Sequence, residues 1–277
     1  MKRTMRGIGP VAAAMLASSA AATPAAAADA TASCCTVVEL RQYALHPQRF
    51  EPFAQLFERE FIEPQEDLGI RILATFRDLD DADRFVWMRG FPDMAARPDA
   101  LSAFYFGPVW QAHRDQANAT MVDSDNVLLL RPLGCDQGLQ AALQPRPAVG
   151  TAARARGVFT ITVCPLRKPA DDVLVRAFDQ HVHPWWVGVG GELLACWVSE
   201  TAANNFPRLP VRENEPVIAW LTRFDDEAAE RRHATLLQAS GCLSRPEWRT
   251  HLSGEPTQLR LAPTDRSALR RRPSHES

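Results

Sequence analysis

The sequence predicts an α+β fold in which a β-α-β-β-α-β module occurs twice in succession and the two modules pack, sheet against sheet, as one barrel. Three observations support this prediction. Strand and helix patterns follow one another in this order twice. Aromatic and proline residues recur between the two runs at matching spacings. Each module alone has helices on only one face of its sheet, so the other face has to be buried against a second layer.

The first strand is predicted at Val37–Leu45, where hydrophobic and polar residues alternate with the period of two that is typical of a half-buried β-strand. An acid, a base and a phenol in one row indicate either an internal ion-pair ladder or the floor of a binding site. Val38 and Leu40 lie on one face, and Glu39, Arg41 and Tyr43 lie on the other.

The first helix is predicted at Gln48–Asp67, where apolar residues recur three or four apart and form one aromatic-rich stripe. Gly69 is placed to end this helix. The remaining elements of the first module, residues 36–133, are strands at Ile70–Arg77, Phe85–Phe91 and Val127–Arg131, an acidic turn at Asp78–Asp83, and a broken helical region at Asp93–Ala119.

Residues 134–156 are rich in Gly, Pro, Gln and Ala and are predicted to link the two modules. The second module, residues 157–264, repeats the order of the first. Its strands are predicted at Phe159–Val163, Glu192–Val198, Val217–Phe224 and Gln258–Leu261, and its helices at Asp171–His183 and Asp226–Ala239.

Residue spacing shows the recurrence directly. Matching residues of the two modules lie 121 positions apart through the second strand and 133 positions apart in the third strand. The increase of 12 places a longer hairpin loop with three prolines at Asn204–Pro216. We therefore interpret the chain as a tandem repeat with one insertion. Pairs at a spacing of 121 are Phe57 with Phe178 and Phe76 with Trp197; pairs at 133 are Trp87 with Trp220 and Phe91 with Phe224.

The element order is that of the ferredoxin-like fold, and the first module resembles the NIPSNAP family of the dimeric α/β-barrel superfamily. The resemblance rests on the E-x-R-x-Y strand, the F-x-W strand and the Pro108-Val109-Trp110 turn. It covers Val37–Pro132, and more weakly Val158–Pro263. It implies the barrel fold but no single activity, since the family is linked mainly to scaffolding and trafficking. The wider superfamily includes small monooxygenases, haem-degrading enzymes and haem proteins.

Composition limits the classes of partner. A formal net charge of −2 gives no basic footprint for nucleic acid. No stretch approaches the about 20 consecutive apolar residues of a membrane span. Residues 1–30 combine a basic start, a short apolar run and small residues before Ala30, which predicts a signal peptide and export to the periplasm. The alternatives are a disordered leader or a misplaced start codon on a cytoplasmic protein. Residues 265–277 are expected to form a disordered tail.

Cysteine spacing predicts no metal centre. The chain has six cysteines, which permit disulfides in an exported protein without fixing their pairing. Cys164 and Cys196 lie inside strand patterns, which favours small buried hydrophobic residues. No pair of cysteines has the close spacing of a zinc site.

The first-strand row Glu39, Arg41 and Tyr43 is the main candidate ligand-binding site. In the functional interpretation, Arg41 binds an anionic or carbonyl oxygen, Glu39 orients the guanidinium, and Tyr43 donates a hydrogen bond. In the structural interpretation, the row is a buried ion pair that fixes strand register. The second module has two threonines and a cysteine at the aligned positions, so any site is expected in the first module.

Trp87 and His113 are further candidates, because they could converge on a cavity between sheet and helix. The structural alternative places Trp87 in the core and His113 in solvent. His181 and His183 lie two apart near a helix end and therefore face different directions, which favours a structural role beside Trp185.

Two classes of function remain open at this point. One is a NIPSNAP-type binding protein without a cofactor, holding a small apolar or anionic ligand, a protein partner or a second copy of the chain. The other is a small-substrate enzyme, monooxygenase-like or isomerase-like, that uses Arg41, Tyr43 and Glu39. An open cavity lined by all three residues favours the enzyme, and a closed arrangement removes that interpretation.

Overall fold

The computed structural model describes residues 34–134, 137–151, 157–188 and 190–270. The expected signal peptide and residues 271–277 of the expected tail lie outside these ranges. The described strands form one closed barrel in which every neighbouring pair is antiparallel. They are β1 (Val37–Leu45), β2 (Arg71–Asp78), β3 (Arg84–Phe91), β4 (Met121–Pro132), β5 (Val158–Pro165), β6 (Glu192–Ser199), β7 (Val217–Phe224) and β8 (Thr257–Pro263).

The strand order around the barrel is β1-β3-β2-β8-β5-β7-β6-β4. Each module contributes a contiguous four-stranded sheet with its first and third strands at the centre, which is the ferredoxin-like arrangement. The two sheets join through short pairings of β2 with β8 and of β4 with β6. The predicted fold of two tandem modules closing one barrel within the chain is therefore confirmed.

The two modules also share their pairing register. Strands β1 and β3 pair in the same way as β5 and β7, at the spacings of 121 and 133 found in the sequence. Each module has a register shift at the same place, after Ile72 in β2 and after Leu193 in β6, again 121 residues apart. At the start of the two pairings, Val37 lies opposite Phe91 in the first module, and Val158 lies opposite Phe224 in the second.

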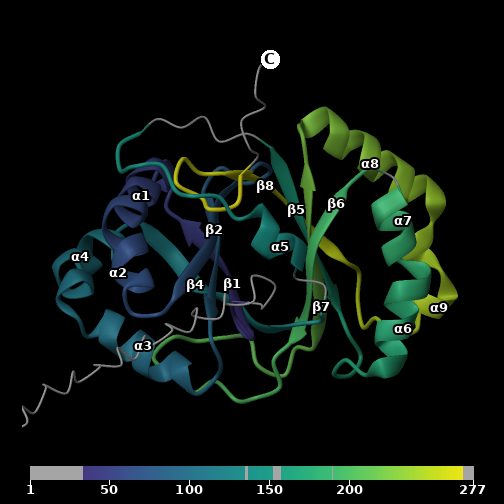
Figure 1. The fold of residues 1–277 in the computed structure, drawn as a ribbon, viewed down its shortest axis with the longest axis horizontal. Coiled ribbons are helices and arrows are strands. Elements are labelled where there is room, and N and C mark those ends of the chain that lie inside the picture. Colours follow the sequence, from purple (N-terminus) through teal and green to yellow (C-terminus); the bar gives the residue numbers. More distant parts are fainter. Residues whose placement is uncertain (1–33, 135–136, 152–156, 189, 271–277) are drawn as a thin grey trace, which may run out of the picture. The chain divides into compact units, whose positions relative to one another are not determined.

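Helices cover the outer face of each sheet, on opposite sides of the barrel (Figure 1). Those of the first module are α1 (Phe50–Leu56), α2 (Ile62–Glu66), α3 (Ala96–Tyr105) and α4 (Pro108–Asn118). Those of the second module are α6 (Asp172–His181), α7 (His183–Gly188), α8 (Glu227–Ser240) and α9 (Pro246–Arg249), with a short 3-10 turn at Cys242–Ser244.

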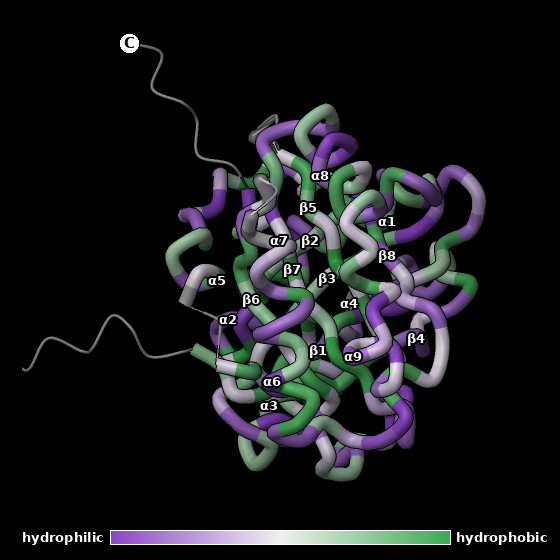
Figure 2. The backbone as a smooth tube through the Cα atoms, turned by 90° about the vertical axis from the view of Figure 1, so that its right-hand side faces the viewer, coloured by the Kyte–Doolittle hydropathy of each residue, from purple (hydrophilic) through white to green (hydrophobic). Residues whose placement is uncertain are grey.

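Three hydrophobic clusters follow from this layering. One fills the barrel interior and contains Val38 and Leu40 of β1. A second lies between the sheet and helices of the first module, and a third occupies the equivalent place in the second module. Figure 2 shows hydrophobic segments concentrated in the strands. Because both sheet faces are covered, β1 is buried on both sides, although its alternating pattern predicted a half-buried strand.

Several predicted boundaries need correction. The expected helix Gln48–Asp67 is α1, a π-helical turn at Phe57–Phe61, and α2. The expected strand Val127–Arg131 is the longer β4, which begins at Met121. The expected helix Asp171–His183 is divided between α6 and α7.

The segments outside the two modules are more structured than expected. The linker contains α5 (Gln137–Ala142), whose Leu139 enters the barrel core. Disorder was the wrong expectation for residues 265–270, because Leu269 is fully buried in the same core. Arg266 is also buried and pairs with Glu63.

Candidate functional site

The polar row of β1 faces the helices of the first module, not the barrel interior. The register of β1 with β3 places Arg41 opposite Trp87 and Glu39 opposite Arg89. Period-two alternation then keeps these four side chains on one face of the sheet. The fifth member of the group, Arg97, comes from α3, which packs over that face.

Glu39 is the centre of a buried cluster of three guanidiniums. Its Oε2 atom accepts hydrogen bonds from Arg41 Nη1 at 2.6 Å and from Arg89 Nε at 2.8 Å. Its Oε1 atom accepts from Arg97 Nε at 2.8 Å. The Nη2 atoms of Arg89 and Arg97 approach the carboxylate at 2.8 and 2.6 Å as ion pairs, but they do not meet hydrogen-bond geometry. All four side chains are at most 1% exposed.

Charge in this cluster is unbalanced, since one carboxylate faces three guanidiniums. Burial by itself raises the pKa of Glu39, but Arg89, Arg41 and Arg97 together outweigh burial and hold that pKa well below its usual range. Burial lowers the pKa of Arg97, and its contacts with Glu39 only partly offset this effect. The cluster therefore carries an excess of positive charge, which is buried between the first-module sheet and its helices.

Two phenols are hydrogen-bonded to arginines of this cluster. Arg41 Nε donates to Tyr43 Oη at 3.0 Å, and Arg89 Nη1 donates to Tyr105 Oη at 3.4 Å. Each phenol oxygen is thus an acceptor, which leaves its own proton as a donor. No acceptor for either proton is found among the described residues. Burial raises the pKa of Tyr43, and Arg41 reduces that rise, so the phenol stays protonated at neutral pH. These are the two tyrosines of the chain.

Both tyrosines line a cavity of about 340 Å³ between the sheet and the helices. Its inner wall is aromatic, and its remaining polar lining includes Arg114, Asp115 and Arg208. Neither Glu39 nor Arg41 lines it. The other lining residues are Phe53, Phe57, Phe61, Trp110, Asn118, Met121, Ser124 and Leu209.

The π-helical turn explains why three phenylalanines share this wall. Side chains four residues apart drift by about 40° around the axis of an α-helix. A π-helical turn places more residues in each turn and reverses that drift. Phe53, Phe57 and Phe61 therefore all face the cavity, and neighbouring rings in this row lie 6.0 Å apart between centroids.

The insertion at Asn204–Pro216 completes the site from the other module. Arg97 Nη1 donates to Asn204 Oδ1 at 2.9 Å and to Asn205 Oδ1 at 2.8 Å. The Phe206 ring lies 6.2 Å from that of Tyr105, and the next residues of the loop contribute Arg208 and Leu209 to the cavity wall. One guanidinium of the cluster thus fixes the loop that covers the cavity.

Of the remaining candidates, Trp87 adjoins the cluster, since the guanidiniums of Arg41 and Arg89 lie 5.6 and 5.1 Å from its ring centroid. Trp87 is 2% exposed and packs between Tyr43 and Phe57, with ring centroids 5.8 and 4.8 Å away. His113 lies on α4, with Nε2 3.5 Å from Glu60 Oε2 and its ring centroid 6.2 Å from that of Phe61. Among the ring contacts of the described residues, none joins His113 to Trp87. His181 ends α6 and His183 begins α7, so the two histidines lie in different helices.

The main residues that sequence reasoning missed are Arg89, Arg97 and Tyr105. Arg89 had a usable signal, because an arginine inside the FVWMRGF strand has to be paired wherever that strand is buried. Arg97 and Tyr105 had none, since a charged residue and an aromatic residue are both ordinary on an amphipathic helix.

The described residues contain no group of three or more His, Cys, Asp and Glu side chains placed to hold a metal ion. They also contain no helix that is both long and apolar enough to cross a membrane.

One family model matches the first module. The NIPSNAP family model matches residues 38–135, which include β1 except its first residue, all of β3 and α3, and the whole buried cluster. This part of the chain is therefore similar to the NIPSNAP family. No curated protein matches the chain.

Solved structures that are similar to parts or most of this chain include NIPSNAP proteins and proteins with other names. A NIPSNAP-like domain protein from Burkholderia xenovorans is 26% identical and covers 42% of this chain and 95% of its own, with a TM-score of 0.34. A putative monooxygenase from Lactobacillus acidophilus is 9% identical, covers 83% of this chain and 97% of its own, and has a TM-score of 0.46. An anthrone oxidase-like protein is 13% identical over 84% of this chain and 93% of its own, with a TM-score of 0.48.

Proposed function

We propose that the NIPSNAP module binds a small ligand with an aromatic or apolar body and an anionic or carbonyl oxygen. The ligand occupies the cavity lined by Tyr43 and Tyr105, beneath the loop of the second module. The observation that carries this proposal is the pair of phenols at the cavity wall, each accepting a hydrogen bond from a buried arginine.

The two phenols supply the polar recognition. A hydroxyl that accepts from a guanidinium is polarised, because hydrogen bonds in a chain strengthen one another. Tyr43 and Tyr105 are therefore good donors to a ligand oxygen, and the excess positive charge behind them favours an anionic one.

The aromatic wall supplies the shape. The π-helical row and Trp110 offer ring faces and edges to a flat ligand body, and pairs of aromatic rings contribute about 0.5–1.5 kcal/mol beyond area burial. The 340 Å³ volume lies at the small end of ligand pockets, about 300–1,000 Å³. A single aromatic ring with a short carboxylate side chain is of suitable size.

Glu39 and Arg41 take a supporting part in this proposal. Both side chains are buried and line no part of the cavity, so they cannot touch a bound molecule. We therefore do not propose the enzyme that uses Arg41 and Glu39 on a substrate. Their effect on the ligand passes through the hydroxyl of Tyr43.

The two tyrosines allow a direct test, because the chain has no others. The full-length protein labelled with 3-fluorotyrosine gives one ¹⁹F resonance for each. We expect titration with benzoate or phenylacetate to shift both resonances, and the neutral analogues benzyl alcohol and toluene to shift them less. If no compound shifts either resonance at millimolar concentration, the proposal is wrong.

A conservative variant identifies the polar contact. Tyr43→Phe keeps the ring and removes the donor, so we expect carboxylate affinity to fall about tenfold or more, since a hydrogen bond to a charged group contributes about 1.5–3 kcal/mol. The matched control is Phe50→Leu, a buried aromatic of α1 that does not line the cavity. Equal losses in the two variants would indicate a general packing effect.

A further inference from the structure

A second, larger cavity lies at the start of β1 and contains a disulfide between consecutive cysteines. Cys34 and Cys35 are bonded to each other. They line a cavity of about 700 Å³ together with residues of β2, the end of α2 and the connection after α5. This cavity shares no lining residue with the aromatic cavity of the proposed ligand site.

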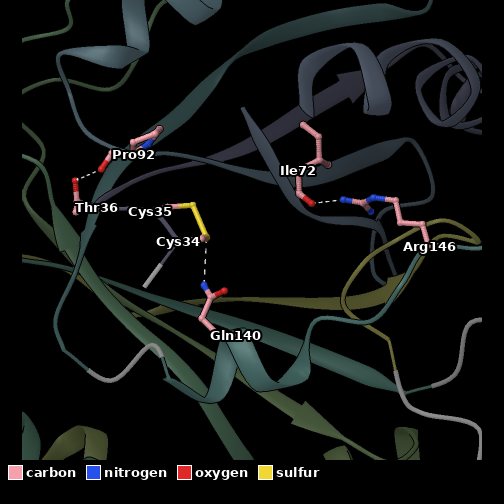
Figure 3. Close-up of a disulfide and its surroundings, with 7 residues drawn as sticks. All are labelled: Cys34, Cys35, Thr36, Ile72, Pro92, Gln140 and Arg146. Atoms are coloured by element: carbon pink, nitrogen blue, oxygen red, sulfur yellow. Dashed lines mark hydrogen bonds between the residues drawn. A yellow bond between two sulfur atoms is a disulfide. The ribbon is translucent and has the colours of Figure 1, made fainter. Parts of the chain in front are cut away.

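The two sulfur atoms have different surroundings. Cys35 is 4% exposed and packs into the sheet, where a Cβ atom on Gly90 would clash with its Sγ. Glycine weakens a strand interior, and here it marks a close approach. Cys34 is only partly buried, and Gln140 Nε2 of α5 donates to its Sγ at 3.2 Å (Figure 3). Cys34 is thus the sulfur that a small molecule in the cavity can reach.

The cavity wall carries one cation that is not neutralised. Arg146 pairs with Glu66 at 2.8 Å, and Glu63 pairs with Arg266. Arg71, at the start of β2, is exposed and forms no ion pair with any carboxylate of the described residues. A carboxylate on a molecule that enters the cavity therefore has a counter-ion available.

We propose that Cys34 and Cys35 form a thiol–disulfide exchange site for small thiols that carry a carboxylate. The thiolate of the small molecule attacks Cys34 Sγ, the bond between the two cysteines breaks, and Cys35 leaves as a thiolate that takes up a proton. A second small thiol then attacks the mixed disulfide. It releases Cys34 as a thiol and the small molecule as its own disulfide, so the pair gains two electrons and two protons.

Position and charge select the thiol in this site. Exchange rates depend on access to the attacked sulfur and on the attacking thiolate, and the cavity provides access to Cys34 while the sheet shields Cys35. Arg71 favours the anionic thiol by holding its carboxylate in the cavity.

Reduction of the native, full-length protein by glutathione and by neutral 2-mercaptoethanol tests this proposal. Iodoacetamide labelling followed by peptide mass spectrometry measures reduction of the peptide that contains both cysteines. We expect a mixed disulfide on Cys34 with glutathione. Arg71→Ala is expected to slow the glutathione reaction about two- to five-fold and to leave the 2-mercaptoethanol reaction unchanged.

Two results would overturn the proposal. One is a pair that resists both thiols in the folded protein at concentrations that reduce it in urea. The other is an Arg71→Ala variant in which reduction by both thiols is slowed equally, because the charge of Arg71 would then not select between them. Cys34→Ser is the control for site assignment, because it must abolish the mixed disulfide while circular dichroism confirms folding.

Discussion

Replacing Glu39 by glutamine tests whether its carboxylate holds the first module together. The change keeps the size of the side chain and removes the charge that neutralises part of the buried cluster. Arg41, Arg89 and Arg97 all contact this carboxylate at 2.6–2.8 Å and are almost fully buried. Without it, three guanidiniums face one another in a site shielded from water.

The expected cost is large. Removing one partner of a buried ion pair costs about 3–5 kcal/mol, because the remaining charge is left uncompensated. Three guanidiniums depend on Glu39, so we expect the free energy of unfolding to fall by about 4 kcal/mol at pH 7. This is about a thousandfold in the folding equilibrium constant and a substantial part of the about 5–15 kcal/mol that keeps a protein folded.

Acid should reduce the difference between the two proteins. The folded-state pKa of Glu39 lies below its ordinary value because the three guanidiniums outweigh burial. Its charge therefore stabilises the fold above the ordinary pKa of about 4.3, and this stabilisation is lost as pH falls from there toward the folded-state pKa. Glutamine has no such dependence, so the gap between wild type and variant narrows below about pH 4.

Urea denaturation followed by circular dichroism at pH 7 and pH 3 measures both effects. Glu51→Gln is the matched control: Glu51 pairs with Arg77 on the surface of the same module and is 67% exposed, so its loss should change stability by less than about 1 kcal/mol. A Glu39→Gln variant that is also destabilised by less than about 1 kcal/mol would refute the description of the cluster as a buried charge network.

Three further outcomes follow from the structure. In a Tyr105→Phe variant, where Tyr43 is the single tyrosine, spectrophotometric titration should show ionisation above the ordinary pKa of about 10, because burial raises the pKa of Tyr43; ionisation below pH 10 would contradict this. Burial lowers the pKa of His233, so its neutral form stabilises the fold above the ordinary pKa of about 6.5 and stability falls as pH drops through the folded-state value. The melting temperature should therefore fall less between pH 7 and pH 5 in His233→Gln than in wild type. An equal fall in the two proteins would contradict the lowered pKa of His233. Gly90→Ala forces a Cβ against Cys35 and should cost about 1–3 kcal/mol in denaturation experiments; an unchanged midpoint would show that the sheet can accommodate it.

Most of the fold could be predicted from the sequence because the residue patterns that indicate its strands and helices are local and occur twice. Hydrophobic alternation and helical periodicity identify elements from neighbouring residues alone, and the spacings of 121 and 133 recur as pairing registers in the barrel. The π-helical turn was not readable, since a π-helical turn and an α-helix of the same residues have similar hydrophobic patterns.

The candidate site was readable only in part. The row Glu39, Arg41 and Tyr43 was visible because three polar side chains on one strand face require partners wherever that face is buried. The partners Arg97 and Tyr105 come from α3, and nothing in the sequence of that helix distinguishes them from surface residues.

Thus the sequence by itself determined the modules, their order and the polar row, because these depend on residue periodicity and spacing. Only the tertiary structure decided that Glu39 and Arg41 are closed off while Tyr43 reaches a cavity, and that Asn204 and Asn205 of the second module bind Arg97 of the first. Such contacts join residues more than a hundred positions apart, and they exist only once the barrel has closed and brought the insertion loop over α3.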